Sequence, residues 1–158
     1  MRRLFWIPLT AMLIGLDRLT KWWATSHLKL GQAHPLIGET IRLTRVHNVG
    51  GAFGAFPGSG GMFIGVSMAV SVILIVVLAF RQDLSSLLRV GIAVVLAGAI
   101  GNLIDRLASG YVLDFFEIRG FPVFNLADAC VTIGAGLIII YVLFGGGRHR
   151  PFRQTDRA

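Results

Sequence analysis

Long apolar stretches alternate with polar segments along the chain. Four of these stretches are close to the roughly 20 helical residues that cross a hydrocarbon core, and they cover about residues 4–24, 61–80, 90–108 and 123–144. We therefore expect an all-α membrane protein with four transmembrane helices, built as a single integral membrane domain over residues 1–158.

The polar segment between the first two stretches, at about residues 25–60, carries a strand signal. Residues 40–44 read Thr-Ile-Arg-Leu-Thr, which alternates polar and apolar side chains at a period of two. This period is typical of a half-buried β-strand, and the glycines and Pro57 that follow end it before the second apolar stretch. We expect a small extracytoplasmic β-containing segment that lies as a platform on the membrane surface.

The composition supports lipid as the solvent for most of the chain. Hydrophobic residues make up 54% of the sequence, charged residues make up 15%, and the mean hydropathy is +0.72, which lies outside the balance of a soluble globular protein. The net charge of +7 is compatible with nucleic-acid binding, but the basic residues lie between the apolar stretches and form no basic face. We expect no nucleic-acid partner.

The basic residues instead indicate how the chain crosses the membrane, because cytoplasmic loops retain Lys and Arg. One side holds more of them, namely Arg2, Arg3, Arg81, Arg89, Arg148, Arg150, Arg153 and Arg157, and the other holds Lys29, Arg42, Arg45 and Arg119, with Arg106 near the boundary. We therefore expect both termini in the cytoplasm, including a tail over about residues 145–158. The segments at about 25–60 and 109–122 then share the outer face.

Three charged residues interrupt the first apolar stretch: Asp17, Arg18 and Lys21. They stand where a cleaved signal peptide would have its small-residue cleavage site, so they favour a retained helix. Asp17 and Lys21 are four residues apart and share a helix face, which allows an ion pair just below the outer interface. Arg18 lies off that face, and we expect its guanidinium to extend toward the outer headgroups.

The third stretch ends with polar residues among small ones, in the run Gly98–Arg106. The small residues permit close helix contact, and Asp105 suits an ion pair at a helix end. Asn102 and Arg106 are four residues apart and project in the same direction. An amide and a fixed cation can hold a peptide carbonyl or a carboxylate, although Arg106 is equally compatible with an anchor at the membrane interface.

Two aspartates have poorly solvated or uncompensated surroundings. Asp114 lies among apolar and aromatic neighbours, and Asp128 has no cation within a helical turn, with Asn125 three residues before it on the same face. Like carboxylates held close together share one proton, so that one becomes a base and the other an acid. Such a pair can hydrolyse a peptide bond with water and without metal. An equally open alternative is that each carboxylate is hydrogen-bonded singly to the backbone or to Arg106.

Other hydrolytic chemistries have weaker support. The run Gly65–Ala69 resembles a serine-nucleophile turn around Ser67, but no histidine falls in a span to act as its base. His27, His34 and His47 lack the His-Glu-x-x-His spacing of a zinc protease. We expect neither a metal nor another cofactor.

Five blocks, in order along nearly the whole chain, carry a resemblance to a known family. They are Asp17–Lys21, Asn48–Gly54, Gly101–Arg106, Gly110–Phe115 and Phe124–Asp128. With the four apolar stretches, they make the chain resemble the bacterial lipoprotein signal peptidase family, also called signal peptidase II. The resemblance implies an aspartyl endopeptidase of the bacterial cytoplasmic (inner) membrane with its site toward the outer face. The implied reaction removes the signal peptide from diacylglyceryl-modified prolipoproteins by cleavage before the lipidated cysteine.

The same resemblance implies roles for individual residues. It makes Asp114 and Asp128 the catalytic pair. It places a second group around the substrate and gives a third a supporting role; these are Asn48, Gly98, Asn102, Arg106 and Asn125, and then Asp17 and Lys21. The family commonly has Asn-Thr-Gly-Ala-Ala-Phe-Gly where residues 48–54 read Asn-Val-Gly-Gly-Ala-Phe-Gly, so positions 49 and 51 depart from it. We expect this turn to act as a mobile lid.

The partners implied by the resemblance are diacylglyceryl-prolipoprotein substrates, membrane lipid and cyclic peptide inhibitors such as globomycin. Two other classes of function remain open. A small proton-coupled transporter also uses intramembrane carboxylates and arginine, but its charged path should cross both leaflets, and here these residues gather toward the outer side. A noncatalytic assembly factor would use the same residues as structural ion pairs.

Overall fold

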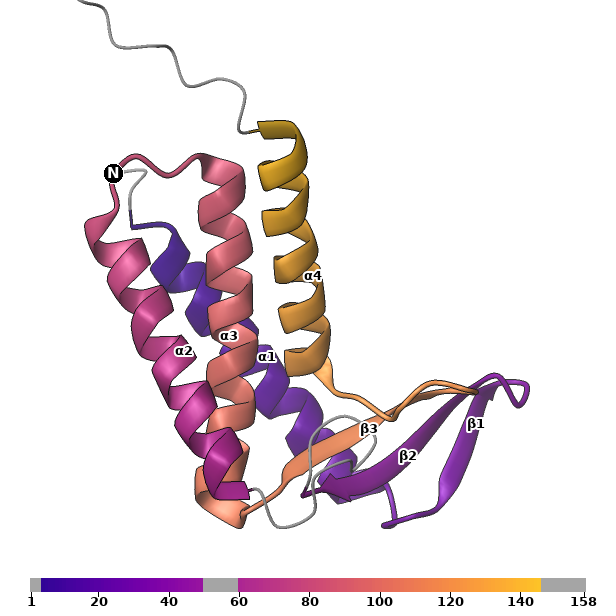
Figure 1. Cartoon of the computed structure of the whole chain (residues 1–158). Helices are drawn as coiled ribbons and strands as arrows, with labels where there is room; N and C mark the ends of the chain where they lie inside the picture. The colour runs from indigo at the N-terminus through magenta and orange to yellow at the C-terminus, as the bar shows by residue number, and fades with distance from the viewer. Residues whose placement is uncertain (1–3, 50–59, 146–158) are drawn as a thin grey trace, which may run out of the picture.

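The computed structural model describes residues 4–49 and 60–145. Figure 1 shows the long helices packed as a bundle, with a small sheet at one end. The helices are α1 (Trp6–His27), α2 (Gly60–Phe80), α3 (Ser86–Ser109) and α4 (Leu126–Ile140), and α4 continues as a π-helical turn, η2 (Tyr141–Gly145). Each expected apolar stretch is helical, although α4 begins at Leu126 and not near residue 123.

Helix α3 is the centre of the bundle and contacts each of the other three helices. A buried apolar cluster of Leu78, Ile92, Ala93 and Leu96 joins it to α2. On the side facing α4, glycines let the two backbones approach: a Cβ at Gly98 would lie 2.3 Å from the carbonyl oxygen of Ala127. The expectation that small residues permit close helix contact is therefore confirmed.

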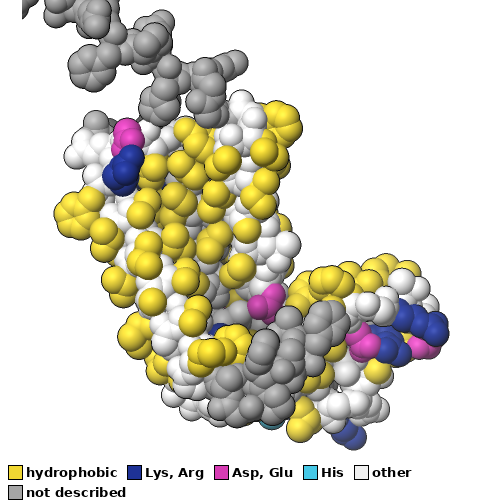
Figure 2. Space-filling view, in the orientation of Figure 1, with side chains coloured by type: hydrophobic (Ala, Val, Ile, Leu, Met, Phe, Trp, Pro, Cys, Tyr) yellow, Lys and Arg dark blue, Asp and Glu magenta, His cyan; other side chains and the backbone are white. Residues whose placement is uncertain are grey.

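The bundle presents an apolar surface, with hydrophobic side chains covering the face shown in Figure 2. In the described residues, three helical segments are long and apolar enough to cross a membrane: Gly61–Phe80, Ser86–Ser109 and Leu126–Phe144. Large side chains such as Val72 and Ile73 on α2 are more than half exposed, which suits contact with lipid and not with water. The fold is therefore that of a helical integral membrane protein.

Three antiparallel strands form the sheet, in the order β1 (Ala33–Ile37), β2 (Ile41–Asn48) and β3 (Val112–Ile118). The strand predicted from the alternation over residues 40–44 is confirmed as part of β2, whereas β1 and β3 were not predicted. The register pairs Val46 with Asp114 and Asn48 with Val112. The segment between α1 and α2 thereby lies beside the segment that follows α3.

The sheet is attached to the bundle where α1 ends and β3 begins. Ala24 and Leu28 on one side pack with Leu113 and Phe115 on the other in a second buried apolar cluster. Helix α3 ends at Ser109 and is capped by Gly110, whose φ of 80° is in the left-handed region that favours glycine. The chain therefore turns from α3 into β3 within a few residues, which keeps the strand close to the end of the helix.

Candidate active site

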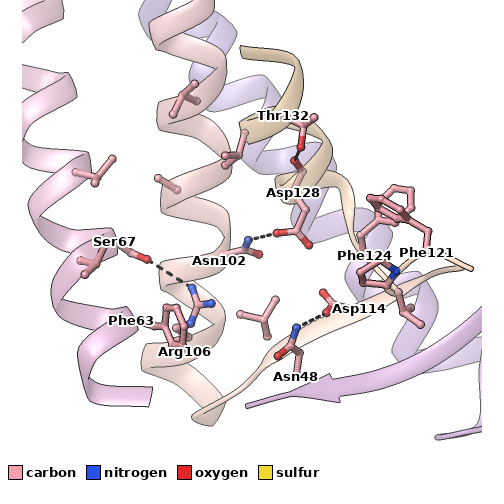
Figure 3. Close-up of a pocket in the computed structure, with 18 residues that line it drawn as sticks. Asn48, Phe63, Ser67, Asn102, Arg106, Asp114, Phe121, Phe124, Asp128 and Thr132 are labelled. Atoms are coloured by element: carbon pink, nitrogen blue, oxygen red, sulfur yellow. Dashed lines mark hydrogen bonds between the residues drawn. The ribbon is translucent and has the colours of Figure 1, made fainter. Parts of the chain in front are cut away.

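A cavity of about 500 Å³ opens between the bundle and the sheet. Side chains from α2, α3, β3 and α4 line it, and Figure 3 shows how the polar ones lie. Asp114 extends from β3 and Asp128 from the first turn of α4 toward the same space. The two aspartates singled out from the sequence thus line one cavity, although they come from different elements.

Asp114 is held by two amides and is almost fully buried, with 2% of its surface exposed. Its Oδ1 accepts a hydrogen bond from Asn125 Nδ2 at 2.6 Å, and its Oδ2 accepts one from Asn48 Nδ2 at 2.9 Å. Burial raises the pKa of Asp114 to about 7, and the negative charge of Asp128 adds to this effect. A carboxyl group with this pKa can exchange a proton near neutral pH.

Asp128 accepts hydrogen bonds on both carboxylate oxygens. Its Oδ1 accepts from Asn102 Nδ2 at 2.7 Å, and its Oδ2 accepts from the backbone N–H of Asn125 at 3.2 Å. The backbone N–H of Asp128 in turn donates to Asn125 Oδ1 at 2.9 Å. These reciprocal bonds form a capping box that starts α4.

Asn125 therefore lies between the two aspartates and contacts both. Its side chain caps α4 and donates to Asp114, while its backbone donates to Asp128. Of the two arrangements left open by the sequence, single hydrogen bonds to the backbone or to Arg106 do not match this geometry. Each carboxylate accepts two hydrogen bonds, and side-chain amides donate three of the four.

Arg106 lies one turn beyond Asn102 on α3, and both line the cavity, which confirms that they project in the same direction. The guanidinium Cζ lies 5.2 Å from the centroid of the Phe63 ring, and Nη1 is 3.5 Å from Ser67 Oγ. Helix α2 thus braces this cation at the cavity (Figure 3). Sequence reasoning set Ser67 aside as a nucleophile and missed its contact with Arg106, for which the sequence has no signal.

An ionic cluster lies behind the cavity, between α1 and α3. Lys21 Nζ is 2.9 Å from Asp17 Oδ2 and 2.7 Å from Asp105 Oδ2. Both the expected pair of Asp17 with Lys21 and the expected pairing of Asp105 with a cation are confirmed. Arg18 also joins the cluster, at 2.8 Å from Asp17 and 2.6 Å from Asp105. The expectation that its guanidinium extends toward the outer headgroups is wrong, because two anions bind it within the bundle.

Not every residue expected around the substrate lines the cavity. Asn48, Asn102 and Arg106 do so. Asn125 is 1% exposed and acts through its hydrogen bonds to the aspartates. Gly98 lies at the contact between α3 and α4 and not on the cavity wall. The turn over residues 50–54, expected to form a lid, lies outside the described residues.

Solved bacterial membrane enzymes share this fold. One, determined by the in meso method at 2.3 Å resolution, superposes with a TM-score of 0.85 at 28% sequence identity over 93% of this chain and 92% of that chain. Another, at 1.9 Å resolution, gives 0.80 at 30% identity over 88% and 92%. The chain thus belongs to a class of helical membrane enzymes, with a small sheet at one end of the bundle.

Sequence relatives define the family more closely. The family described as Signal peptidase (SPase) II matches residues 9–144. Lipoprotein signal peptidases of Moorella thermoacetica and Acinetobacter baylyi are 37% and 38% identical, covering 88% and 89% of this chain and 93% and 83% of their own lengths. This chain belongs to the signal peptidase II family, and it is a membrane protease of the aspartic type. The transporter alternative has no support from these comparisons.

Proposed function

We propose that this protein removes signal peptides from diacylglyceryl-modified prolipoproteins, and that Asp114 and Asp128 are its catalytic pair. One observation carries the assignment of the pair. Two carboxylates from separate elements reach one cavity, where Asn125 contacts both and Asn102 and Asn48 hold one each. The membership of the chain in the family supports the substrate class.

The arrangement suits hydrolysis by general acid–base chemistry. One carboxylate accepts a proton from water as the water oxygen attacks the carbonyl carbon of the scissile peptide. The other carboxyl group donates its proton to the leaving nitrogen as the C–N bond breaks, which yields a free amine and a carboxylic acid. The proton taken from water then replaces the one that was donated, so the pair ends the cycle with one proton, as it began.

The walls of the cavity fit an apolar peptide segment. Val70 on α2, Val95 on α3 and Val131 on α4 are among the side chains that line it. We place the signal peptide against these helices, so that only the scissile bond reaches the carboxylates and the acyl chains stay in lipid. Lipidated cysteine is then favoured over unmodified cysteine because its acyl chains anchor it in the membrane, by about 0.8 kcal/mol for each CH₂ buried in lipid, and so hold the bond before it at the depth of the carboxylates.

The remaining site residues have roles that follow from their contacts. Asn48 and Asn125 orient Asp114, and Asn102 orients Asp128. Arg106 presents a braced guanidinium to the cavity and is suited to hold a carbonyl oxygen of the substrate. Gly98 sets the distance between α3 and the first turns of α4. Cyclic peptides such as globomycin fit the same cavity as substrate-like inhibitors.

We further propose that α1 is a fourth membrane span. Asp17 and Lys21 are 1% and 4% exposed, and together with Arg18 and Asp105 they form a cluster of two anions and two cations. Pairing of this kind lowers the cost of charge within a bilayer. The positions of Lys and Arg then put both termini and residues 145–158 in the cytoplasm, and the sheet and the site at the outer face, in a single domain.

Replacement of either aspartate tests the catalytic pair. The purified Asp114→Asn and Asp128→Asn proteins should each cleave a lipidated prolipoprotein at least about 100-fold more slowly than wild type, because an amide cannot exchange the proton. Asp83→Asn is the matched control, since Asp83 is an exposed aspartate paired with Arg81 on the connection between α2 and α3. Near wild-type cleavage by either cavity variant would contradict the proposal.

A further inference from the structure

A buried lysine is connected to Asp128 through one asparagine. Lys21 Nζ donates to Asn102 Oδ1 at 3.1 Å, and Asn102 Nδ2 donates to Asp128 Oδ1 at 2.7 Å. Resting on the proposed catalytic pair, we propose that Lys21 is a positioning residue: its ammonium fixes the orientation of the Asn102 amide, which holds Asp128 as the ionised member of the pair. Asp114 then carries the proton.

The orientation of Asn102 follows from the donors around it. An ammonium group has three N–H donors and no acceptor, so the carbonyl oxygen of Asn102 must face Lys21. Asn125 Nδ2 donates to the same Oδ1 at 3.2 Å. With two donors meeting this oxygen, the NH₂ end of Asn102 is left to face Asp128. A reversed amide would oppose N–H groups to both donors and a carbonyl oxygen to a carboxylate.

Lys21 is itself fully satisfied, which keeps its position defined. Its Nζ contacts three acceptors: Asp17 Oδ2 at 2.9 Å, Asp105 Oδ2 at 2.7 Å and Asn102 Oδ1 at 3.1 Å. Three donors thus meet three acceptors at a side chain that is 4% exposed. Two of these acceptors are carboxylates, and the third bond points the ammonium at the site.

The chain of hydrogen bonds from Lys21 through Asn102 reaches Asp128 and distinguishes it from Asp114. Both oxygens of Asp128 accept N–H bonds, and one of these donors is Asn102, which Lys21 orients. Donors of this kind favour the charged carboxylate. Asp114 also accepts two amide N–H bonds, but it is almost fully buried whereas Asp128 is only partly buried, and burial raises the pKa of Asp114 to about 7. On this geometry the shared proton belongs to Asp114.

Other charged residues also act on Asp128 and Lys21. Those acting on Asp128 are Lys21 and Asp17 from α1, Arg106 from α3 and Asp114 from β3. Those around Lys21 are Asp17 and Arg18 from α1 and Asp105 from α3, with the phenol of Tyr111 lining the same side. Only Lys21 combines a positive charge with the hydrogen bond to Asn102 in the described part of the chain.

The cluster also holds the fold together, so positioning must be separated from stability. Asp17 Oδ1 accepts from the backbone N–H of Ala127 at 3.1 Å, and Asp105 Oδ2 accepts from that of Leu113 at 3.3 Å. These bonds tie the cluster to the chain next to each catalytic aspartate. Arg18 pairs with the same two carboxylates and bonds the carbonyl of Gly101. It therefore shares the structural role of Lys21 and is a matched control.

The experiment compares Lys21→Met with Arg18→Met in detergent. Lys21→Met should lower kcat at least about 10-fold with KM within about 2-fold, because the reacting groups and not the substrate contacts are disturbed. Arg18→Met should keep kcat within about 3-fold of wild type at a similar loss of Tm. If kcat follows Tm in the same proportion in both variants, Lys21 is only structural and the proposal is overturned.

The pH–rate profile gives a readout that stability does not move. The acidic limb should shift to higher pH in Lys21→Met, since a cation that favours the ionised pair is gone, and should stay in place in Arg18→Met. Asn102→Leu keeps the ion pairs of Lys21 and should show the same shift, so the test stands even if Lys21→Met fails to fold. An unshifted profile in Asn102→Leu overturns the proposal.

A double variant tests whether Lys21 acts through Asn102. If Lys21 acts through Asn102, then Lys21→Met combined with Asn102→Leu should lose no more kcat than the more impaired single variant. Additive losses would show separate roles and overturn the proposal. Failure of the catalytic pair itself would appear differently, as retained activity in Asp114→Asn or Asp128→Asn.

Discussion

Burial governs the behaviour of Asp114 more than any single contact. The side chain lies at 2% exposure between β2 and the start of α4, and its pKa is raised to about 7, mainly by burial. In the unfolded chain the same carboxyl group titrates near its ordinary value of about 3.8. The folded protein therefore binds this proton more tightly than the unfolded chain does, between these two pH values. Its contribution to stability is complete below about pH 4 and is lost as pH rises through about 7.

The direction of this change in stability with pH can be measured by comparing wild type with Asp114→Asn, whose amide does not titrate. As pH rises from about 4 to about 8, the Tm of wild type should fall relative to that of the variant, because only wild type loses a stabilising proton. Thermal unfolding in detergent across this range measures the difference, with Asp83→Asn as an exposed control. A difference in Tm that is constant with pH would mean that Asp114 is not buried as described.

Side-chain roles were predictable from the sequence where the partner was close along the chain. The pair of Asp17 with Lys21 follows from helical spacing alone. The partner of Arg18 in α3 does not, because Asp105 reaches it only through the packing of α1 against α3. The spacing and surroundings singled out both aspartates, and family resemblance assigned the roles, but neither gives the hydrogen bonds through which Asn125 contacts both aspartates.

At the scale of elements, the contact of α3 with α4 controls where Asp128 lies. Gly98 faces the first turns of α4, and an added Cβ there would lie 2.3 Å from Ala127 O and 2.7 Å from Val131 Cγ2. The backbone of Ala127 cannot move aside as the end of a flexible side chain can. Any side chain at this position must therefore push α4 away from α3, together with Asp128.

Gly98→Ala should consequently destabilise the protein by about 1–3 kcal/mol, the usual cost of overpacking, and should also lower kcat. Gly15→Ala is the matched control, because Gly15 lies in helix α1 with nothing within 4 Å of an added Cβ. Alanine there should be neutral or stabilising, since glycine weakens helices. Equal Tm values and rates for the two variants would contradict the close contact.

The strands show why patterns predict some elements and miss others. Strand β2 is half buried along its whole length and alternates at its start, so its period is visible. Strand β3 is buried at its first four residues, Val112 to Phe115, and has no exposed face there to produce alternation. Its pairing with β2 brings together segments far apart in the sequence. The strand that carries Asp114, and its pairing with β2, therefore could not be predicted from local pattern.

At the scale of the whole molecule, charged residues of the described chain lie either at the ends of the bundle or in the ionic cluster inside it. Within the residues that the structure describes, three helices have apolar spans, and the charges of α1 are matched within the cluster. Hydropathy predicted these helices because lipid imposes a minimum length and an apolar composition on any span. It does not show which side of the membrane each connection faces.

Labelling with a membrane-impermeant thiol reagent tests the proposed four spans. The single cysteine of the sequence, the buried Cys130, is first replaced by alanine. In this background, Glu39→Cys on the turn between β1 and β2 should react in intact cells that lack an outer-membrane barrier. Leu4→Cys and Gln82→Cys should react only after the membrane is opened, because we place both in the cytoplasm. Labelling of Leu4→Cys and Glu39→Cys from the same side would show that α1 does not cross.

The cap of α4 restricts position 125 to one kind of residue. Serine, threonine, aspartate and asparagine all start helices well, and any of them can accept the N–H of Asp128. The place also demands two further donors, one for Asn102 and one for Asp114. Asparagine alone in that set has an oxygen and two N–H groups on so short a stem. Of the residues that cap helices well, only asparagine can therefore form every hydrogen bond that this position requires.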